Sequence, residues 1–574
     1  MRRSQMAFIR KSGVRSVPTV PADVNYTFND AELEALKEYG TIVSHEADEL
    51  LADEGTTRQD FLVTLSGETH IFAETPEGPK RLGWMEPGQF TGDISVITGA
   101  ASLVRVVMGK PGDLLHISYE QLQTLLVANS ALSDIIVKTL TARRAFAHNA
   151  DHGSVIVIGA PQDRLVFTAR DLLSKFGIPH RWLSPETDPL AESLLKAKGI
   201  DPADLPVVFR GGSEVLIRPT ATEISHAFGF DLLQDGASAD VIVVGAGPAG
   251  LAASVYAASE GLSVIAIDSG NPGGQAGTSS KIENYLGFPT GVSGQELTER
   301  AVIQALKFGV SLTAPVKAAS LESRDNRFCI GLDDGRAITS KAVVIATGAQ
   351  YQRLPLENIE RFEGRGVYYG ATPMEAQLCG GSEVVVVGAG NSAGQGAVFL
   401  SGSAKKVHIL YRRADIRETM SEYLVKRLEE TSNIYLHPET EISALHGIEG
   451  ADELDDRLLS ITHKHRTSGA IGTCEAPFVF LFVGAKPFTG WLPADMTCDK
   501  TGFVKTGSDL ANLDLVKAGW SLERMPSEYE TSWPRVYAVG DVRAGSVKRV
   551  ASAVGQGSVV VSHIHGAIAE LSDS

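Results

Sequence analysis

Residues 239–268 read ADVIVVGAGPAGLAASVYAASEGLSVIAID, and this stretch decides the fold of the C-terminal half of the chain. An apolar run, a glycine-rich turn, a helical pattern and a second apolar run predict a strand, a tight turn, a helix and a second strand. Gly245, Gly247 and Gly250 form a GxGxxG motif. The first glycine permits the turn, the second lets backbone approach a pyrophosphate, and the third lets the helix pack on the strand. The segment therefore predicts a βαβ nucleotide-binding unit.

Two further features of this unit support a nucleotide site. Pro248 and Ala249 open the predicted helix, and the N-terminus of a helix attracts phosphate groups. Asp268 ends the second strand about 20 residues after the motif, where a carboxylate can accept hydrogen bonds from ribose hydroxyls. A solvated acidic residue at a strand end is the alternative interpretation of Asp268. The motif and the carboxylate together favour nucleotide binding.

The pattern repeats at residues 382–413, SEVVVVGAGNSAGQGAVFLSGSAKKVHILYRR. The second turn and the helix start after it contribute Gly388, Gly390, Asn391, Ser392 and Ala393. The second strand ends at Leu410 without a carboxylate, and three arginines follow it: Arg412, Arg413 and Arg417. Guanidinium groups at this position suit a ribose 2′-phosphate, which favours NADP over NAD. A solvated basic face is the alternative.

Three other stretches complete a family pattern. They are GGQAGTSSKIENYLGFP (273–289), VVIATGA (343–349) and VYAVGDVRAGSVKRVASAVGQG (536–557). With both glycine turns, they make residues 239–570 similar to the low-molecular-weight thioredoxin reductases, which bind FAD and NADPH. The resemblance implies that FAD lies at the first turn and NADPH at the second.

The resemblance also implies further FAD contacts, at Gly274, Gln275, Asn284, Thr347, Gly348, Gly540, Asp541, Lys548, Arg549 and Val550. Lys548, Arg549 and Val550 would approach the flavin. The carboxylate of Asp541 would reach a ribityl hydroxyl, and the amides of Gln275 and Asn284 would hydrogen-bond a neutral ring.

The segment before the second turn departs from this family. In the family it carries a redox pair as Cys-Ala-Thr-Cys, whereas this chain has Gly370-Ala371-Thr372-Pro373. Flavin-to-disulfide transfer needs one thiolate that attacks and a second sulfur that closes the bond, and neither is present. Cys379, six residues further on, is expected to be a small buried hydrophobic residue, with an intermolecular or sulfenate-forming thiol as the alternative.

Residues 154–183, SVIVIGAPQDRLVFTARDLLSKFGIPHRWL, predict a strand, a loop, a helix and a second strand. With this pattern, residues 151–232 resemble a glutaredoxin or thioredoxin domain. In such domains the nucleophilic cysteine opens the first helix, because the helix dipole lowers the pKa of a thiol there. The corresponding loop here is Ala160-Pro161-Gln162-Asp163 and holds no cysteine. Pro206, before a predicted strand, fits the family's cis-proline position, with an ordinary strand-edge proline as the alternative.

Residues 1–150 resemble a cyclic-nucleotide-binding β-roll with terminal helices. The stretch FTGDISVITGAASLVRV (90–106) follows the order of the family's phosphate cassette, with Asp93 in place of the usual glutamate. Ser102 stands at the expected arginine position, and Arg105 would face the opposite side of a strand. We therefore expect a structural or interaction role rather than nucleotide binding.

The predicted fold class is α/β. Two Rossmann-like domains, with an NADPH domain (352–475) inserted in an FAD domain (238–351 and 476–574), follow the β-roll and the small thioredoxin-like domain. We expect a homodimer.

Composition narrows the functional classes. The net charge of −17 argues against a nucleic-acid partner, which would need a concentrated basic face. No apolar run reaches the roughly 18 residues of a membrane span, and the N-terminus lacks the apolar run of a secretory signal, so we expect a cytoplasmic protein without a membrane partner. The four cysteines form no CxxC pair, and no metal site is expected.

The leading hypothesis is an NADPH-oxidising flavoprotein reductase that resembles thioredoxin reductase but has no internal redox disulfide. Hydride would pass from NADPH to FAD and then to an unidentified acceptor, for example ferredoxin, flavodoxin, a quinone or oxygen. Two alternatives remain. One is a sensor of redox state or NADPH with slow turnover, and the other is a ligand-regulated binding protein led by the N-terminal β-roll.

Overall fold

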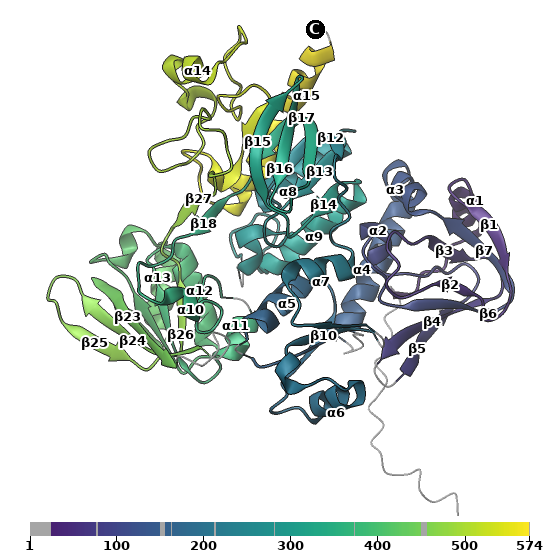
Figure 1. Cartoon of the computed structure of the whole chain (residues 1–574), viewed down its shortest axis with the longest axis horizontal. Coiled ribbons are helices and arrows are strands. Elements are labelled where there is room, and N and C mark those ends of the chain that lie inside the picture. The colour runs from purple at the N-terminus through teal and green to yellow at the C-terminus, as the bar shows by residue number, and fades with distance from the viewer. Residues whose placement is uncertain are drawn as a thin grey trace, which may run out of the picture.

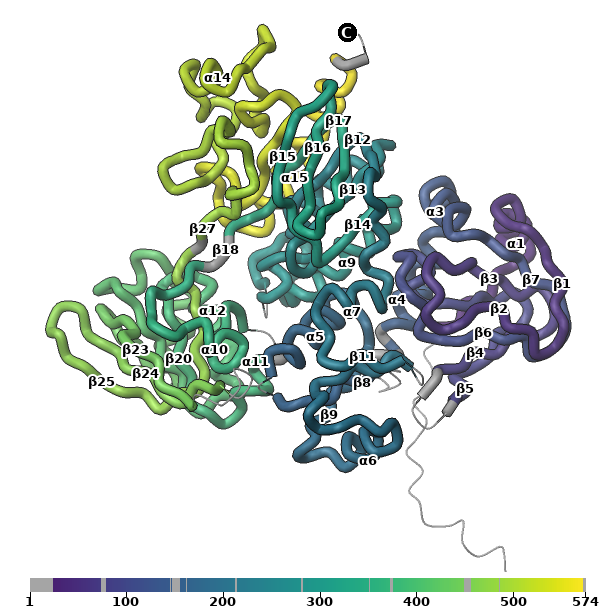
Figure 2. Tube along the Cα trace, viewed as in Figure 1, coloured from purple at the N-terminus to yellow at the C-terminus, as the bar shows by residue number. Residues whose placement is uncertain are grey.

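The computed structural model describes residues 24–75, 78–149, 155–161, 163–211, 214–279, 282–371, 373–448 and 456–572. Figure 1 shows four units that follow one another around the molecule, and Figure 2 traces the chain through them. We call them the N-terminal unit (24–149), the small unit (155–233), the first nucleotide unit (234–351 with 485–572) and the second nucleotide unit (352–484).

The N-terminal unit consists of two antiparallel sheets and flanking helices. One sheet has the order β1-β7-β3, and the other has the order β2-β6-β4-β5. The strands are β1 (Thr41–His45), β2 (Leu50–Ala52), β3 (Phe61–Thr64), β4 (Glu68–Thr75), β5 (Gly78–Met85), β6 (Arg105–Lys110) and β7 (Gly112–Ile117). The helices are α1 (Asp30–Lys37), α2 (Ser95–Thr98), α3 (Tyr119–Ala128) and α4 (Ser130–Asn149).

Within the described residues, no single helix is long and apolar enough to cross a membrane. Helix α3 and the first part of α4 pass that test of length and composition only when they are taken together. The chain bends by 120° between these two helices. Leu122, Leu125 and Leu126 of α3 and Leu132 and Ile136 of α4 are buried in the core of the N-terminal unit.

The small unit is a four-stranded sheet with the order β11-β10-β8-β9. Strands β8 and β9 are parallel, and β10 is antiparallel to both β8 and β11. The elements are β8 (Val155–Ile158), α5 (Arg164–Lys175), β9 (His180–Leu183), α6 (Pro189–Lys198), β10 (Val207–Arg210), β11 (Glu214–Ile217) and α7 (Ala221–Phe228). The Leu205–Pro206 peptide bond is cis, as expected for that position.

The first nucleotide unit is built on a seven-stranded sheet. Its order is β14-β13-β12-β17-β16-β15, and β28 also pairs with β17. The strands are β12 (Ser238–Val244), β13 (Val264–Ile267), β14 (Ser311–Thr313), β15 (Ala318–Arg324), β16 (Arg327–Leu332), β17 (Ala337–Ile345) and β28 (Val536–Ala538). The helices are α8 (Pro248–Ser259), α9 (Gly294–Lys307), α14 (Asn512–Ala518) and α15 (Val550–Ser572).

The predicted strand–turn–helix–strand order of this unit is confirmed. Strands β12 and β13 are parallel neighbours, and all four residues of β13 are buried, because a parallel sheet is covered on both faces. C-terminal β28 returns beside β17, so the last part of the chain completes the first sheet.

The second nucleotide unit has a five-stranded parallel sheet with the order β19-β26-β20-β21-β22. A smaller antiparallel sheet, β23-β24-β25, belongs to the same unit. The strands are β19 (Val367–Tyr368), β20 (Glu383–Val387), β21 (Lys406–Leu410), β22 (Ile434–His437), β23 (Thr440–Ile448), β24 (Arg457–His465), β25 (Ile471–Cys474) and β26 (Phe478–Leu481). The helices are α10 (Ile359–Phe362), α11 (Pro373–Leu378), α12 (Asn391–Ser401) and α13 (Glu422–Glu430).

The predicted end of the second unit at residue 475 is wrong. Strand β26 lies between β19 and β20 in the five-stranded sheet, so the unit continues past it. The chain crosses between the two nucleotide units through β18 (Ala349–Tyr351) and β27 (Ala485–Pro487), which pair with each other. An apolar strand such as FVFL could belong to the sheet of either nucleotide unit. Only its pairing with β19 and β20 assigns it to the second unit.

Candidate functional site

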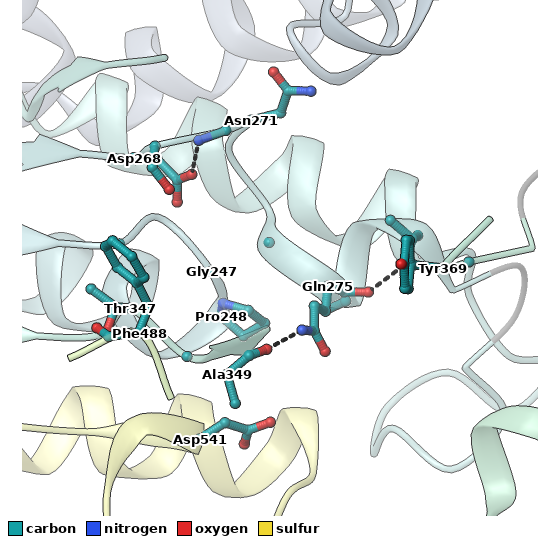
Figure 3. Close-up of a pocket in the computed structure, with 18 of the residues that line it drawn as sticks. Gly247, Pro248, Asp268, Asn271, Gln275, Thr347, Ala349, Tyr369, Phe488 and Asp541 are labelled. Carbon is teal, nitrogen blue, oxygen red and sulfur yellow. Dashed lines mark hydrogen bonds between the residues drawn. The ribbon is translucent and has the colours of Figure 1, made fainter. Parts of the chain in front are cut away.

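A cavity of about 560 Å³ lies where three of the four units meet. Most of its wall comes from the first nucleotide unit, from the first glycine turn to the start of α15. The second nucleotide unit contributes Tyr368, Tyr369 and Ser392, and helix α5 of the small unit contributes Phe167 and Lys175. Figure 3 shows Asp268 and Asp541 on opposite sides of this space, with Gln275 and Ala349 between them.

The first glycine turn forms part of the cavity wall, and two of its glycines, Gly245 and Gly250, leave no room for a side chain. Gly245 has a φ of +109°, which favours glycine. A Cβ on Gly250 would stand 1.8 Å from the carbonyl oxygen of Gly245, so only glycine lets α8 approach β12 this closely. Gly247 precedes α8 and has no side-chain cap, so the first N–H groups of the helix remain open to a phosphate.

Asp268 occupies the end of the cavity beside β13. Its Oδ2 accepts a hydrogen bond from the Ala246 N–H at 2.6 Å, and its Oδ1 accepts one from the Gly270 N–H at 2.9 Å. Burial raises the pKa of the Asp268 carboxyl, although both N–H donors and nearby Lys175 oppose that shift. Each oxygen keeps a lone pair that can accept from a hydroxyl group.

The opposite end of the cavity is lined by Thr347, Gly348, Lys548, Arg549 and Val550. A second carboxylate, Asp541, stands here, and burial raises its pKa. Lys548 donates to the backbone oxygen of Asp541 at 2.8 Å. The side-chain amide of Gln275 donates to the carbonyl oxygen of Ala349, as Figure 3 shows. This end therefore offers polar groups on an apolar wall that includes Phe488 and Trp491.

The second glycine turn lies in the second nucleotide unit, and one of its residues reaches the shared cavity. Gly388 has a φ of +145°, and Gly390 precedes α12 without a side-chain cap. The Oδ1 of Asn391 accepts from the Ser421 N–H at 2.8 Å and anchors the loop before α13. Ser392, in the first turn of α12, lines the same cavity as the first glycine turn.

The three arginines after β21 are exposed but differ in their partners. Arg413 pairs with Glu418 at 2.6 Å, and Arg417 pairs with Glu429 at 2.6 Å. Among the described residues, the Arg412 guanidinium makes no ion pair. Arg412 is therefore the arginine of this group whose guanidinium is free to bind an anion.

The family model of the pyridine nucleotide-disulphide oxidoreductases matches residues 239–557, which is more than half of the chain. The chain belongs to this family. The thioredoxin reductase of Treponema pallidum is 31% identical over 320 residues, which cover 56% of this chain and 94% of that protein. The thioredoxin reductase of Bacillus subtilis is 28% identical over 336 residues, which cover 58% of this chain and 96% of that protein.

A solved thioredoxin reductase from Lactococcus lactis has 25% sequence identity and a TM-score of 0.50, and the match covers 58% of this chain and 99% of that one. Members of this family use FAD and NADPH, and this chain is an NADPH-dependent flavoprotein oxidoreductase. The cavity fits such a cofactor, because it joins a glycine turn that admits no Cβ at Gly245 or Gly250 to two partly desolvated carboxylates.

Among the residues that the structure describes, this pyridine nucleotide-disulphide oxidoreductase has no cysteine at the cavity. All four cysteines lie in the described part of the chain, each is a free thiol, and none lines the cavity. Gly370, at the first position of the missing pair, does line it. Pro373 begins α11, and Thr372 lies outside the described residues.

The expectation that Cys379 is a small buried residue is confirmed. Its exposed fraction is 0%, and it belongs to the core of the second nucleotide unit. Burial raises the pKa of its thiol to about 11. A thiol in this state is a poor nucleophile, because only the thiolate attacks.

Three of the predicted FAD contacts, Asn284, Gly250 and Gly540, do not line the cavity. Asn284 is exposed and is absent from the cavity wall. The reason is local: Ile282 pairs with Val292 in a β-bridge and is buried, and the chain then turns outward into a surface loop. Gly250 and Gly540 lie behind the wall and act through close packing, since a Cβ on Gly540 would stand 2.7 Å from Ala249.

The predicted residues of the second turn and the arginine cluster lie, with one exception, outside the wall of the shared cavity. Of the whole set, only Ser392 lines the shared cavity; the others are Gly388, Gly390, Asn391, Ala393, Arg412, Arg413 and Arg417.

Sequence reasoning missed the contribution of α5. The Asn271 amide donates to Asp171 Oδ2 at 2.7 Å, and Asp171 also pairs with Lys175 at 2.9 Å. The Phe167 ring packs on Tyr368 with a centroid separation of 5.9 Å. One helix of the small unit thus contacts both nucleotide units beside the cavity. No motif in α5 indicates this, because the contact depends on how the units dock.

Proposed function

We propose that the shared cavity holds FAD, with its adenosine end at Asp268 and its flavin end beside Lys548, Arg549 and Val550. When bound, FAD accepts hydride from NADPH and passes electrons to an acceptor outside the chain. The observation that carries this proposal is the position of Ser392. It belongs to the helix that begins at the second glycine turn, and it lines the cavity that the first glycine turn helps to form. A nicotinamide held by the second turn can therefore enter the same space.

Different residues of the chain would bind different parts of the two cofactors. Asp268 would hold the ribose hydroxyls, and the open N–H groups of α8 would hold the phosphates. Asp541 and Gln275 would orient the ring end, while Phe488 and Trp491 exclude water on one side. Arg412 would bind the 2′-phosphate of NADPH.

We further propose that electrons leave without an internal dithiol. Gly370 and Pro373 replace both sulfurs of the family's pair, and Cys379 is buried with a raised pKa. An acceptor that meets the flavin directly, such as ferredoxin, flavodoxin, a quinone or oxygen, needs no thiol exchange.

The test is to replace Cys379 with serine and measure two NADPH-driven rates. Ferricyanide reduction should keep most of the wild-type rate, because the thiol lies in the core and off the cavity. Reduction of an aromatic disulfide reagent should be slow in both proteins, since no internal dithiol can exchange with it. Rapid disulfide reduction that disappears in the variant would overturn the proposal.

The N-terminal half is proposed to be a β-roll of the cyclic-nucleotide-binding type followed by a thioredoxin-like unit. The two antiparallel sheets and the order β11-β10-β8-β9 support this. At the cassette, Asp93 pairs with Arg144 at 2.7 Å, and the Ala101 N–H donates to the carbonyl oxygen of Phe228 at 3.0 Å. The cassette backbone thus bonds the small unit, which supports an interaction role.

A second candidate function, a ligand-regulated reductase, is favoured by another cavity. It has a volume of about 340 Å³ and lies where the N-terminal, small and first nucleotide units meet. Arg58, Tyr119, Phe176 and Glu299 line it, and Lys175 lines both this cavity and the shared one. A ligand bound in this cavity would affect the flavin site through α5, which carries Lys175.

Assembly as a homodimer and a cytoplasmic location are also proposed. Exposed Tyr256 on α8 and Val559 on α15, two helices that pack together, support contact with a second copy.

A further inference from the structure

A cluster of metal-binding side chains lies in the second nucleotide unit, outside the shared cavity. Glu383 begins β20, His408 lies on β21 and Cys474 ends β25. One ligand atom from each residue lies within 4.8 Å of the other two. The three residues come from two different sheets, so the cluster sits where the antiparallel sheet packs against one face of the parallel sheet.

The neighbours of this cluster orient its ligand atoms. Lys406 contacts Oε1 of Glu383 at 2.8 Å, while Oε2 faces Nε2 of His408 at 3.3 Å. The other ring nitrogen of His408, Nδ1, lies 3.0 Å from Nε2 of His437. When Nδ1 carries the proton and donates it to His437, Nε2 presents its lone pair toward the carboxylate. A metal-binding histidine is commonly fixed by such a hydrogen bond from its second nitrogen.

We propose that Glu383, His408 and Cys474 form a zinc site that joins β25 to β20 and β21. Thiolate, imidazole and carboxylate are the ligands that Zn²⁺ takes in proteins. Bond lengths of about 2.0–2.3 Å at tetrahedral angles place ligand atoms roughly 3.3–3.8 Å apart, which small side-chain rotations reach from the observed spacing. The fourth position is left to water.

The site holds two anionic ligands and one neighbouring cation, Lys406. On binding, the Cys474 thiol loses its proton to solvent, and the thiolate and carboxylate together neutralise the ion. Glu383 and His408 are partly exposed, with 20% and 17% of their side chains accessible, so an ion can reach these two ligands from solvent, whereas Cys474 is the buried ligand of the cluster. His437 acts as a positioning residue, because it contacts His408 and not the ion.

The experiment uses the full-length protein with FAD bound. Zinc-free protein is titrated with Co²⁺ as a spectroscopic probe, and we expect one equivalent per chain to give a thiolate-to-metal charge-transfer band. Cys474→Ser should abolish that band, and Cys498→Ser, a matched change at a partly buried thiol in the first nucleotide unit, should leave it unchanged. His437→Gln should keep the band but weaken Co²⁺ binding by roughly 10–100-fold.

A second measurement uses the unaltered chain and does not depend on the folding of a variant. One equivalent of Zn²⁺ should protect Cys474 from alkylation, mapped by mass spectrometry, and should not change alkylation of Cys498. It should also raise the melting temperature in proportion to the logarithm of free Zn²⁺ above saturation. A Co²⁺ spectrum without a thiolate band, or equal alkylation of Cys474 with and without Zn²⁺, would overturn the proposal.

Discussion

At the scale of single residues, the two nucleotide sites differ in charge. Asp268 follows the second strand of the first unit and is partly desolvated, whereas Arg412 follows the corresponding strand of the second unit and is exposed. A carboxylate suits a free 2′-hydroxyl, and a guanidinium suits a 2′-phosphate. This difference supports the proposal that FAD binds at the first turn and NADPH at the second.

Replacing Arg412 with alanine should reduce the preference for NADPH over NADH. A charge-assisted phosphate contact is worth about 1.5–3 kcal/mol, so the ratio of the kcat/KM values should fall by roughly 10–100-fold. Arg413→Ala is the matched control, because Arg413 already pairs with Glu418, and its effect should be smaller. The measurement is steady-state reduction of ferricyanide with each nucleotide. An unchanged ratio in Arg412→Ala would show that another group binds the phosphate.

At the scale of elements, residues 90–106 of the N-terminal unit, which resemble a phosphate cassette in sequence, take part in a contact with the small unit. The Gly55 N–H donates to the carbonyl oxygen of Ser102, and the Ser102 N–H donates to the carbonyl oxygen of Thr56. Ser102 is buried, and the end of α7 covers the neighbouring Ala101. The backbone amides of this segment are therefore engaged by protein groups.

Cyclic AMP or cyclic GMP at millimolar concentration should leave the melting temperature unchanged. Stabilisation by a ligand requires a concentration well above its dissociation constant, and the engaged cassette offers no arginine at Ser102. Differential scanning fluorimetry checks this, with NADPH as a positive control that should raise the melting temperature. A rise of several degrees with either cyclic nucleotide would show binding, and Arg105 would then be the first residue to replace.

At the scale of the whole molecule, α5 joins the small unit to both nucleotide units. Asp171 bonds Asn271 of the first unit, and Phe167 packs on Tyr368 of the second. In Figure 1, α5 lies between α9 and α11 in the centre of the molecule. The helix therefore fixes the wall of the cavity on the side of Asp268.

Replacing Asp171 with alanine should weaken FAD binding. The change removes the hydrogen bond that holds Asn271 beside Asp268, and a hydrogen bond to a charged group is worth about 1.5–3 kcal/mol, so FAD affinity should fall by roughly 10-fold or more. The fluorescence of released FAD measures this. Glu192→Ala, on the exposed side of α6 in the same unit, is the control. Equal FAD retention in the two variants would contradict the role assigned to α5.

The sequence by itself determined the local parts of this protein. Both glycine turns, the strands beside them and Asp268 were predictable, because a βαβ unit is encoded by apolar periodicity and by glycines at fixed spacing. The sequence also showed directly that the sulfur pair is absent at Gly370 and Pro373. From this we expected Cys379 to be buried and inactive.

Only the tertiary structure decided what depends on pairing and docking between distant segments. It assigned β26 to the second unit, turned Asn284 outward, brought α5 to the cavity, and placed Cys474 beside His408. None of these has a local signal, because an apolar strand fits several sheets and a side chain does not encode which distant surface will pack against it. The sequence therefore determined the two nucleotide-binding turns, and the packing of four units determined what surrounds them.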